Sequence, residues 1–370
     1  MIKTHLAAVL DDRVAYRNLE PVMPELAGLR ATWEQIGLDA YRIPRKTEPA
    51  YARVLLSFVQ RAQALRGQPP VARLLFIGDT PMNDAQAARN LGELLPLHGF
   101  IAADRLTESP STKVEGRLMR SNRWASLAAW LDWLRDESVA VDERTALLLD
   151  IDKTLMGARG RNDHVINAAR VAAIEATMRA ALGSTYDKGR FEAIYERINQ
   201  TVFHPFTKDN QDYVAYVCLM LMAGVHDEDR LWQDLESGDL VSFEAFVDRC
   251  DGGADGMSED LATIHHQVLA GLRAGDPTPF KDFRRQEYLE TIARMDVASG
   301  DTEPELWLER EIVITAEVLN VARWALSQGA LTFGLSDKPD EASIPTAEQA
   351  ARGMLAVHRA TMKVFGESVV

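Results

Sequence analysis

The sequence predicts an α/β protein with a parallel central sheet and a large helical insertion, and three observations support this. Four short apolar runs are each followed at once by polar or acidic residues, which is typical of strands buried on both faces of a parallel sheet. Helical patterns separate these runs, as an α/β fold requires. Between Thr154 and about Arg310, apolar residues recur at helical spacing without a convincing strand.

The elements of the predicted sheet domain follow from these runs. The four strands are predicted at residues 73–77, 99–103, 146–149 and 330–335. A helix ending near Leu65 precedes the first strand, and an amphipathic, Trp-rich helix over residues 124–134 leads into the third. A helix over residues 316–328 precedes the fourth strand, and Gly329 is its expected C-cap. Residues 106–116 are predicted to form a polar loop.

The middle of the chain is predicted to be helical throughout. Six helices are expected at residues 165–182, 190–202, 209–223, 243–250, 258–272 and 283–295. Gly and Pro residues punctuate them. The predicted organisation is therefore a core formed by residues 1–153 and 311–370, with a helical insertion at 154–310 between its two parts.

Composition narrows the classes of partner and compartment. The 370 residues include 41 Lys and Arg against 55 Asp and Glu, so the formal charge is −14. This acidic balance argues against nucleic acid as a partner, although an anionic small molecule in a locally basic pocket remains compatible. The two cysteines lack a CxxC motif and are expected to be reduced in a cytoplasmic protein. We find neither a signal peptide nor an apolar run of about 18 residues, so no membrane association is expected.

The sharpest chemical signal is the Asp-x-Asp-x-Thr run that follows the third predicted strand. It places Asp150 and Asp152, with Thr154, at the carboxyl edge of the sheet, where open α/β folds bind ligands. Because the chain turns here, one carboxylate can face a substrate while the other stands beside it. Such a pair suits a nucleophile and a general acid/base, with a hard cation to screen the charges. The alternative interpretation is an acidic turn after a strand.

This strand and its Asp-x-Asp-x-Thr run resemble the first motif of the haloacid dehalogenase-like superfamily. The fourth motif of that superfamily is a strand followed by Gly-Asp and a second acidic residue, and Gly78, Asp79 and Asp84 are similar to it. The resemblance implies a Rossmann-like core with a parallel sheet. It also implies that Asp79, Asp84 and Asp150, with the backbone carbonyl of Asp152, hold Mg²⁺.

Two further motifs of the superfamily have counterparts here. Ser336, followed by Asp337, Lys338 and Pro339, is similar to the second motif, whose hydroxyl binds a phosphoryl oxygen; Thr315 is a weaker candidate. Lys46, at the start of the helix that ends near Leu65, matches the third motif. The resemblance implies that its ammonium offsets the charge of the nucleophile and of the phosphoryl group.

The order of these motifs is unusual. They run third, fourth, first and second, at Lys46, Asp79, Asp150 and Ser336, which predicts a circularly permuted member of the superfamily. A domain tolerates circular permutation well when its termini lie close together at its surface. Two alternatives are a tandem of incomplete domains, for which residues 7–13 give only a poor first motif, and complementation between two chains.

An insertion directly after the first motif is, in the resembling superfamily, a helical cap that closes over the site and selects the substrate. Its most basic cluster here contains Lys281, Arg284 and Arg285. These cations are predicted to bind a second anionic group of the substrate. The plainer alternative is a solvated helix start with flanking ion pairs.

Together, the resemblance implies a Mg²⁺-dependent phosphatase that acts on a small phosphorylated substrate. Asp150 would form an aspartyl-phosphate, Asp152 would act as general acid and base, and Thr154 would support the loop. Lys153 departs from the pattern, since glycine is frequent at its position. A phosphotransferase, a mutase or a non-catalytic phospho-ligand binding module remains an alternative. The sequence leaves the substrate and the oligomeric state open.

Overall fold

The computed structural model describes residues 2–299 and 302–370, and contacts divide the chain into two compact units. The sheet unit combines Met1–Ala168 with Thr291–Val370, and the helical unit is Ala169–Glu290. The helical unit therefore lies within the sequence of the sheet unit. Its ends fall inside the predicted insertion of residues 154–310.

The sheet unit is built on a seven-stranded sheet within the described residues, in the order β2-β9-β7-β3-β4-β6-β5. The strands are β2 (Val14–Ala15), β3 (Arg73–Gly78), β4 (Leu97–Ala102), β5 (Thr112–Glu115), β6 (Leu118–Ser121), β7 (Thr145–Asp150) and β9 (Leu331–Leu335). Neighbouring strands pair in parallel except β5 and β6, which are antiparallel. The predicted α/β class with a mostly parallel sheet is confirmed.

The central strands are in register, so their carboxyl ends reach one edge of the sheet together. Phe76 in β3 lies opposite Leu148 in β7, which lies opposite Phe333 in β9. All three side chains are buried in one core cluster. Because Asp150 pairs with Leu335, the residues that follow these strands emerge side by side.

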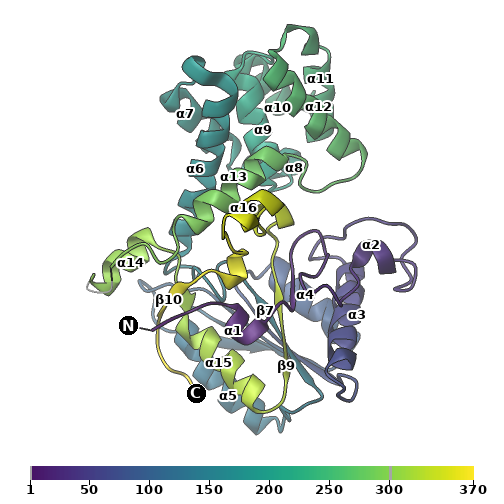
Figure 1. Ribbon diagram of the computed structural model, residues 1–370, viewed down its shortest axis with the longest axis vertical. Helices are drawn as coiled ribbons and strands as arrows, with labels where there is room; N and C mark the ends of the chain where they lie inside the picture. The colour runs from purple at the N-terminus through teal and green to yellow at the C-terminus, as the bar shows by residue number, and fades with distance from the viewer. Residues whose placement is uncertain (1, 300–301) are drawn as a thin grey trace. The chain divides into compact units, whose positions relative to one another are not determined.

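Helices cover both faces of this sheet. Helices α3 (Pro49–Leu65) and α4 (Asn83–Gly92) lie on one face, and α5 (Leu127–Asp136) and α15 (Ala316–Ser327) lie on the other (Figure 1). Helix α3 begins with Pro49, which suits a first turn, and buries Tyr51, Leu55 and Phe58 along one stripe. The Phe58 ring stacks on Phe333 of β9. Gly329, after α15, has the positive φ expected of a C-cap.

Shorter elements of the sheet unit were not predicted. A second sheet has the order β1-β10-β8, with β1 (Lys3–Thr4), β8 (Ile314–Thr315) and β10 (Met362–Phe365). Short helices occur at α1 (Ala7–Leu10), α2 (Leu29–Thr32), α14 (Pro304–Arg310) and α16 (Ala347–Ala351). The predicted polar loop of residues 106–116 is wrong in part, because residues 112–115 form the edge strand β5. Its mostly exposed, polar side chains carry no apolar run.

The helical unit lies within the predicted helical region, although the helices at residues 204–207 and 228–237 were not predicted. Its helices are α6 (Asp163–Leu182, which begins in the sheet unit), α7 (Lys188–Ile198), α8 (His204–Thr207), α9 (Gln211–Met222), α10 (Glu228–Ser237), α11 (Phe243–Asp251), α12 (Glu259–Arg273) and α13 (Lys281–Ile292). Helix α9 is buried from Asp212 to Met222 and forms the centre of this unit's core. A helix that is apolar all round is expected at such a position.

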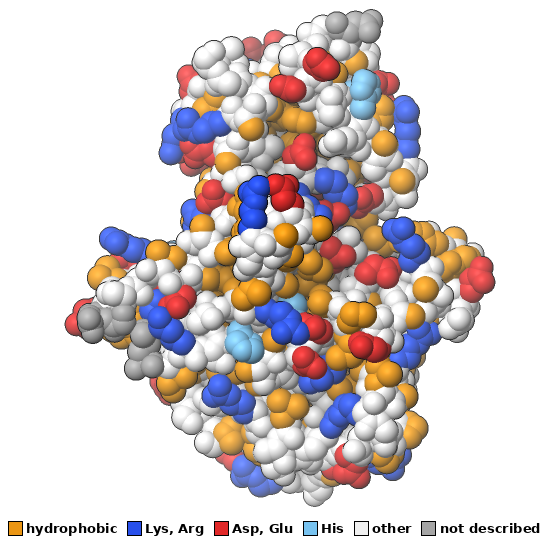
Figure 2. Space-filling view, viewed as in Figure 1, with side chains coloured by type: hydrophobic (Ala, Val, Ile, Leu, Met, Phe, Trp, Pro, Cys, Tyr) orange, Lys and Arg blue, Asp and Glu red, His pale blue; other side chains and the backbone are white. Residues whose placement is uncertain are grey.

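The surface charges and the two cysteines do not point to a particular function. Among the described residues, none of the helices has both the length and the apolar character needed to cross a membrane. On the face shown in Figure 2, Lys and Arg side chains are interspersed with Asp and Glu. Cys218 and Cys250 are free and buried, and burial raises the pKa of both thiols, to about 12 for Cys250. The expected absence of a nucleic-acid partner stays a prediction.

Candidate metal centre and active site

Three aspartates gather at the carboxyl edge of the sheet. Asp150 is the last residue of β7, Asp79 follows the neighbouring strand β3, and Asp84 lies in the first turn of α4. All three are buried, and each offers a carboxylate oxygen within 4.8 Å of the others. We call Asp79, Asp84 and Asp150 the acid cluster. The structure thus joins acids from two separate sequence motifs.

A tight turn after β3 delivers two of these acids. Gly78 is needed here, because a Cβ at its position would lie 2.6 Å from Cβ and Cγ of Asp84. Oδ2 of Asp84 accepts hydrogen bonds from the N–H groups of Asp79 at 3.0 Å and Thr80 at 2.8 Å, and from the Thr80 hydroxyl at 2.6 Å. These bonds fix one oxygen of Asp84 against the turn.

Lys46 contacts two members of the acid cluster. Its Nζ is 2.5 Å from Oδ1 of Asp150 and 2.5 Å from Oδ1 of Asp84, and 3.8 Å from Oδ2 of Asp337. Burial disfavours the ammonium, but the charges of Asp150 and Asp84 outweigh it and raise the pKa of Lys46 well above its ordinary value. The two carboxylates therefore favour the charged form of Lys46.

The cluster still carries excess negative charge. Burial raises the pKa of Asp150, and the charges of Asp84 and Asp79 add to this while Lys46 opposes it. Burial and the charge of Asp84 also raise the pKa of Asp79. Only Asp84 has a lowered pKa, since Lys46 and its hydrogen bonds outweigh the effect of burial. Thr154 donates its hydroxyl to Oδ2 of Asp150 at 2.9 Å, so both oxygens of that carboxylate are held.

Asp152 and Ser336 form a second group beside the acid cluster. Ser336 follows β9 and donates its hydroxyl to Oδ2 of Asp152 at 2.5 Å. Lys338 Nζ lies 3.7 Å from Oδ1 of Asp152 and donates to the Thr291 hydroxyl at 3.1 Å. The Asp152 side chain is thus directed to Ser336 and Lys338, and it is not one of the three that gather. The contact of Lys338 with Asp152 was not predicted from the sequence.

Arg159 was missed by the sequence analysis. It lies in the loop between β7 and α6, and its Nε donates to Oδ2 of Asp79. Burial disfavours its charge, but Asp79 outweighs this and raises the pKa of the guanidinium. The loop thus adds a second cation to the acid cluster.

Hydrogen bonds hold both backbone polar groups of Arg159, its N–H and its carbonyl. The N–H of Arg159 donates to the Lys153 carbonyl at 2.8 Å, and its carbonyl accepts from the Asp104 N–H at 2.9 Å and from Trp124 Nε1 at 3.2 Å. Gly160 has a positive φ, and a Cβ there would lie 1.8 Å from the Asp104 carbonyl oxygen. The Arg-Gly pair was the available sequence signal for this loop.

The predicted substrate-binding cations lie in the helical unit. Arg284 is buried there, with Nη2 2.5 Å from Oδ2 of Asp212 and Nη1 2.6 Å from Oε2 of Glu287. Lys281 Nζ lies 2.8 Å from a carboxylate oxygen of a nearby aspartate, and Arg285 is half-buried. A role for the three in substrate binding stays a prediction.

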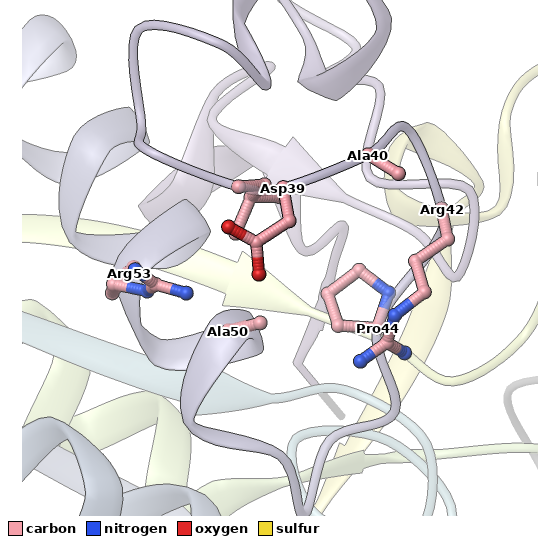
Figure 3. A pocket seen from close by; sticks show the side chains of 7 residues that line it. Asp39, Ala40, Arg42, Pro44, Ala50 and Arg53 are labelled. Carbon is pink, nitrogen blue, oxygen red and sulfur yellow. The ribbon is translucent and has the colours of Figure 1, made fainter.

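A hollow of about 140 Å³ lies between the loop of residues 38–44 and the start of α3 (Figure 3). It is lined by Leu38, Asp39, Ala40, Arg42, Pro44, Ala50 and Arg53. Figure 3 shows Asp39 between Arg42 and Arg53. Arg42 pairs with Glu48, and Arg53 donates to a backbone carbonyl at 3.1 Å. The lining includes no residue of the acid cluster.

Comparison with protein-family models, with curated proteins and with solved structures gives no match. The fold and the site therefore define a class on their own evidence. The chain is an α/β protein with a mostly parallel sheet, a large helical region and a buried triad of aspartates that is a candidate metal centre.

Proposed function

We propose that the chain is a Mg²⁺-dependent phosphatase of the haloacid dehalogenase type, which hydrolyses a small phosphomonoester through an aspartyl-phosphate. The observation that carries this proposal is the acid cluster around Lys46 at the carboxyl edge of a parallel sheet. A buried group of acids with only partial compensation costs stability, so a binding or catalytic role is the economical explanation.

The acid cluster fits a hard divalent cation. Its donors are carboxylate oxygens, which Mg²⁺ prefers, and they are close enough to share one ion. Asp79, Asp84 and Asp150 would hold the ion together with the backbone carbonyl of Asp152. When bound, Mg²⁺ would neutralise charge on the phosphoryl oxygens.

Asp150 is the proposed nucleophile. A carboxylate oxygen attacks phosphorus, and the bond from phosphorus to the ester oxygen breaks, leaving an aspartyl-phosphate. Lys46 contacts Asp150 directly, so its ammonium is placed to offset the charge of both carboxylate and phosphoryl group. Thr154 holds the other oxygen of Asp150 and so orients the carboxylate.

Asp152 is the proposed acid and base. It gives a proton to the departing ester oxygen, and then takes one from the water that attacks the aspartyl-phosphate and restores Asp150. Ser336, which contacts Asp152, is the proposed donor to a phosphoryl oxygen. Both groups stand at the end of strands adjacent in the sheet, β7 and β9.

Circular permutation is part of the proposal. The strands that precede Asp79, Asp150 and Ser336 are immediate neighbours in one sheet of one unit, which supports a single site formed within one chain. The alternative of two domains in tandem needs a first motif near the N-terminus, but Asp11 and Asp12 lie between α1 and β2 rather than after a strand. Asp12 is instead paired with Arg359. The helical unit is the proposed cap.

The test is release of phosphate from p-nitrophenyl phosphate by the full chain with Mg²⁺. Asp150→Asn and a chelator are each expected to lower kcat at least ~1,000-fold, because the nucleophile or the cation is lost. Asp132→Asn removes an aspartate of α5 whose side chain is 65 % exposed, and should leave the rate unchanged. Full activity of Asp150→Asn would contradict the proposal, and transfer of phosphate to an added alcohol rather than water would indicate a phosphotransferase.

A further inference from the structure

We propose that Arg159 binds an oxyanion of the substrate, and that the same guanidinium neutralises Asp79 while no cation is bound. This inference rests on the proposed function and deepens it, since it names a substrate-binding residue that the resemblance did not supply. The sequence around Arg159 matches none of the motifs discussed above.

The guanidinium is only partly used by the protein. Its Nε donates to Asp79, and its two Nη groups make no hydrogen bond to any residue in the described part of the chain. The side chain is 36 % exposed, whereas the Asp79 side chain is 5 % exposed. Arg159 therefore keeps N–H donors that no described residue accepts, on a side chain attached to the acid cluster, and these are available to a planar or tetrahedral oxyanion.

Arg161, in the same loop, shows what a structural arginine looks like. Its Nε donates to Asp104 at 2.8 Å, and its two Nη groups donate to Glu317 at 3.1 and 2.9 Å. Its side chain is 13 % exposed. The guanidinium of Arg161 is thus bound by acids at Nε and at both Nη groups, whereas the two Nη groups of Arg159 bind no described residue although its backbone is hydrogen-bonded on both sides.

Two cations compete for one carboxylate in this arrangement. A divalent ion held by Asp79 weakens the attachment of Arg159, because the carboxylate then shares its charge with the ion. A released guanidinium suits phosphoryl oxygens, which it binds through two parallel N–H groups. Removal of Arg159 should therefore strengthen metal binding and weaken anion binding. An arginine that merely supported the fold would weaken both.

The test measures both affinities on the full chain by isothermal titration calorimetry. Mn²⁺ alone is the first probe, and inorganic phosphate in the presence of saturating Mn²⁺ is the second. Arg159→Gln is expected to bind Mn²⁺ about tenfold more tightly and phosphate about tenfold more weakly. Arg159→Lys keeps the charge, so its Mn²⁺ affinity should stay near that of the wild type while phosphate binding weakens about threefold. Arg135→Gln removes an exposed arginine of α5 and should change neither.

Unchanged or weaker Mn²⁺ binding by Arg159→Gln, or unchanged phosphate binding, would overturn the inference. Should Arg159→Gln fail to fold, equal phosphate affinity in Arg159→Lys and the wild type would do the same. Absence of Mn²⁺ binding in wild type and variants would overturn both this inference and the metal centre of the proposed function. The expected opposite shifts without hydrolysis of any ester would support the role of Arg159 and count against the phosphatase alone.

Discussion

Two buried groups of charged side chains, one in each unit, differ in how their charges balance. The acid cluster sets three carboxylates against Lys46 and Arg159. The second group, which we call the helical ion cluster, sets two carboxylates against two guanidinium groups and consists of Asp212, Glu287, Arg170 and Arg284. Burial of charge is costly in both places, but only the helical ion cluster supplies a cation for each acid.

The geometry of the helical ion cluster shows what balance achieves. Arg284 bridges Asp212 and Glu287, and the N–H of Phe280 donates to Oδ1 of Asp212 at 3.0 Å. Burial opposes the charge on Arg284, but the two acids outweigh it and raise its pKa. Arg170 donates to Glu287 at 3.2 Å and so connects α6 to α13. A balanced cluster fastens helices together, whereas an unbalanced one is suited to bind a cation.

The largest expected effect on stability is in the helical ion cluster. Arg284→Ala would leave Asp212 and Glu287 buried without their shared guanidinium. Breaking one side of a buried ion pair costs ~3–5 kcal/mol, so the free energy of unfolding should fall by about that amount. Urea denaturation of the full chain, followed by circular dichroism, would measure it.

The matched control is Arg179→Ala, which removes an arginine 56 % exposed and paired with Glu175 one helical turn away. Its effect should stay within about 0.5 kcal/mol. If Arg284→Ala unfolded at the same urea concentration as the wild type and only raised KM, Arg284 would return to the substrate-binding role that its basic neighbourhood first suggested.

A substitution in the acid cluster should change the free energy of unfolding in the opposite direction. Asp150→Asn removes one of three crowded negative charges, so the free energy of unfolding without Mg²⁺ should rise by about 1 kcal/mol while catalysis is lost. Denaturation in the presence of a chelator would measure this. A loss of stability comparable to that of Arg284→Ala would mean that the acid cluster is as structural as the helical ion cluster.

The excess of acids in the acid cluster should also make the stability of the metal-free protein depend on pH. Asp79 and Asp150 have pKa values raised by burial, so in the metal-free protein they favour the fold while protonated. This contribution is present at acidic pH and is lost as the pH rises through the folded pKa values, about 7 for Asp79. Metal-free wild type should therefore lose stability between about pH 4, near the ordinary pKa of an aspartate, and about pH 7, measured relative to Asp150→Asn, and its affinity for Mn²⁺ should rise over the same interval.

The parts of the fold that the sequence predicted are those governed by local pattern. Strands β3, β4, β7 and β9 are apolar runs, and their carboxyl ends had to meet because parallel strands end at one edge. Asp79 and Asp150 are therefore expected at the same edge of the sheet. Two-residue strands such as β2 and β8 are too short to show a period, and the exposed edge strand β5 has no apolar run, so the sequence did not predict them.

The parts that it missed depend on contacts between distant residues. Arg159 reaches Asp79 only because its loop is pinned to Asp104 and Trp124, and no spacing rule connects these positions. Arg284 gave a basic cluster by composition, yet its partner Asp212 lies 72 positions earlier in the chain. Local pattern shows that a charge is present, while its partner is decided by tertiary packing.

The smallest expected effect concerns the backbone beside the acid cluster. Lys153, between Asp152 and Thr154, has φ of 64°, a conformation that a side chain disfavours, and Lys208 of the helical unit has φ of 54°. Lys153→Gly and Lys208→Gly should each be more stable than the corresponding alanine variant by about 0.5–1 kcal/mol, because glycine relieves the strain and alanine does not. Phosphate release should stay within about twofold of wild type in both glycine variants.

A large loss of phosphate release in Lys153→Gly and Lys153→Ala alike would assign a function to the Lys153 ammonium, which donates to Asn167 at 2.9 Å. A loss in Lys153→Gly alone would mean that the strained backbone itself positions the loop of Asp150 and Asp152.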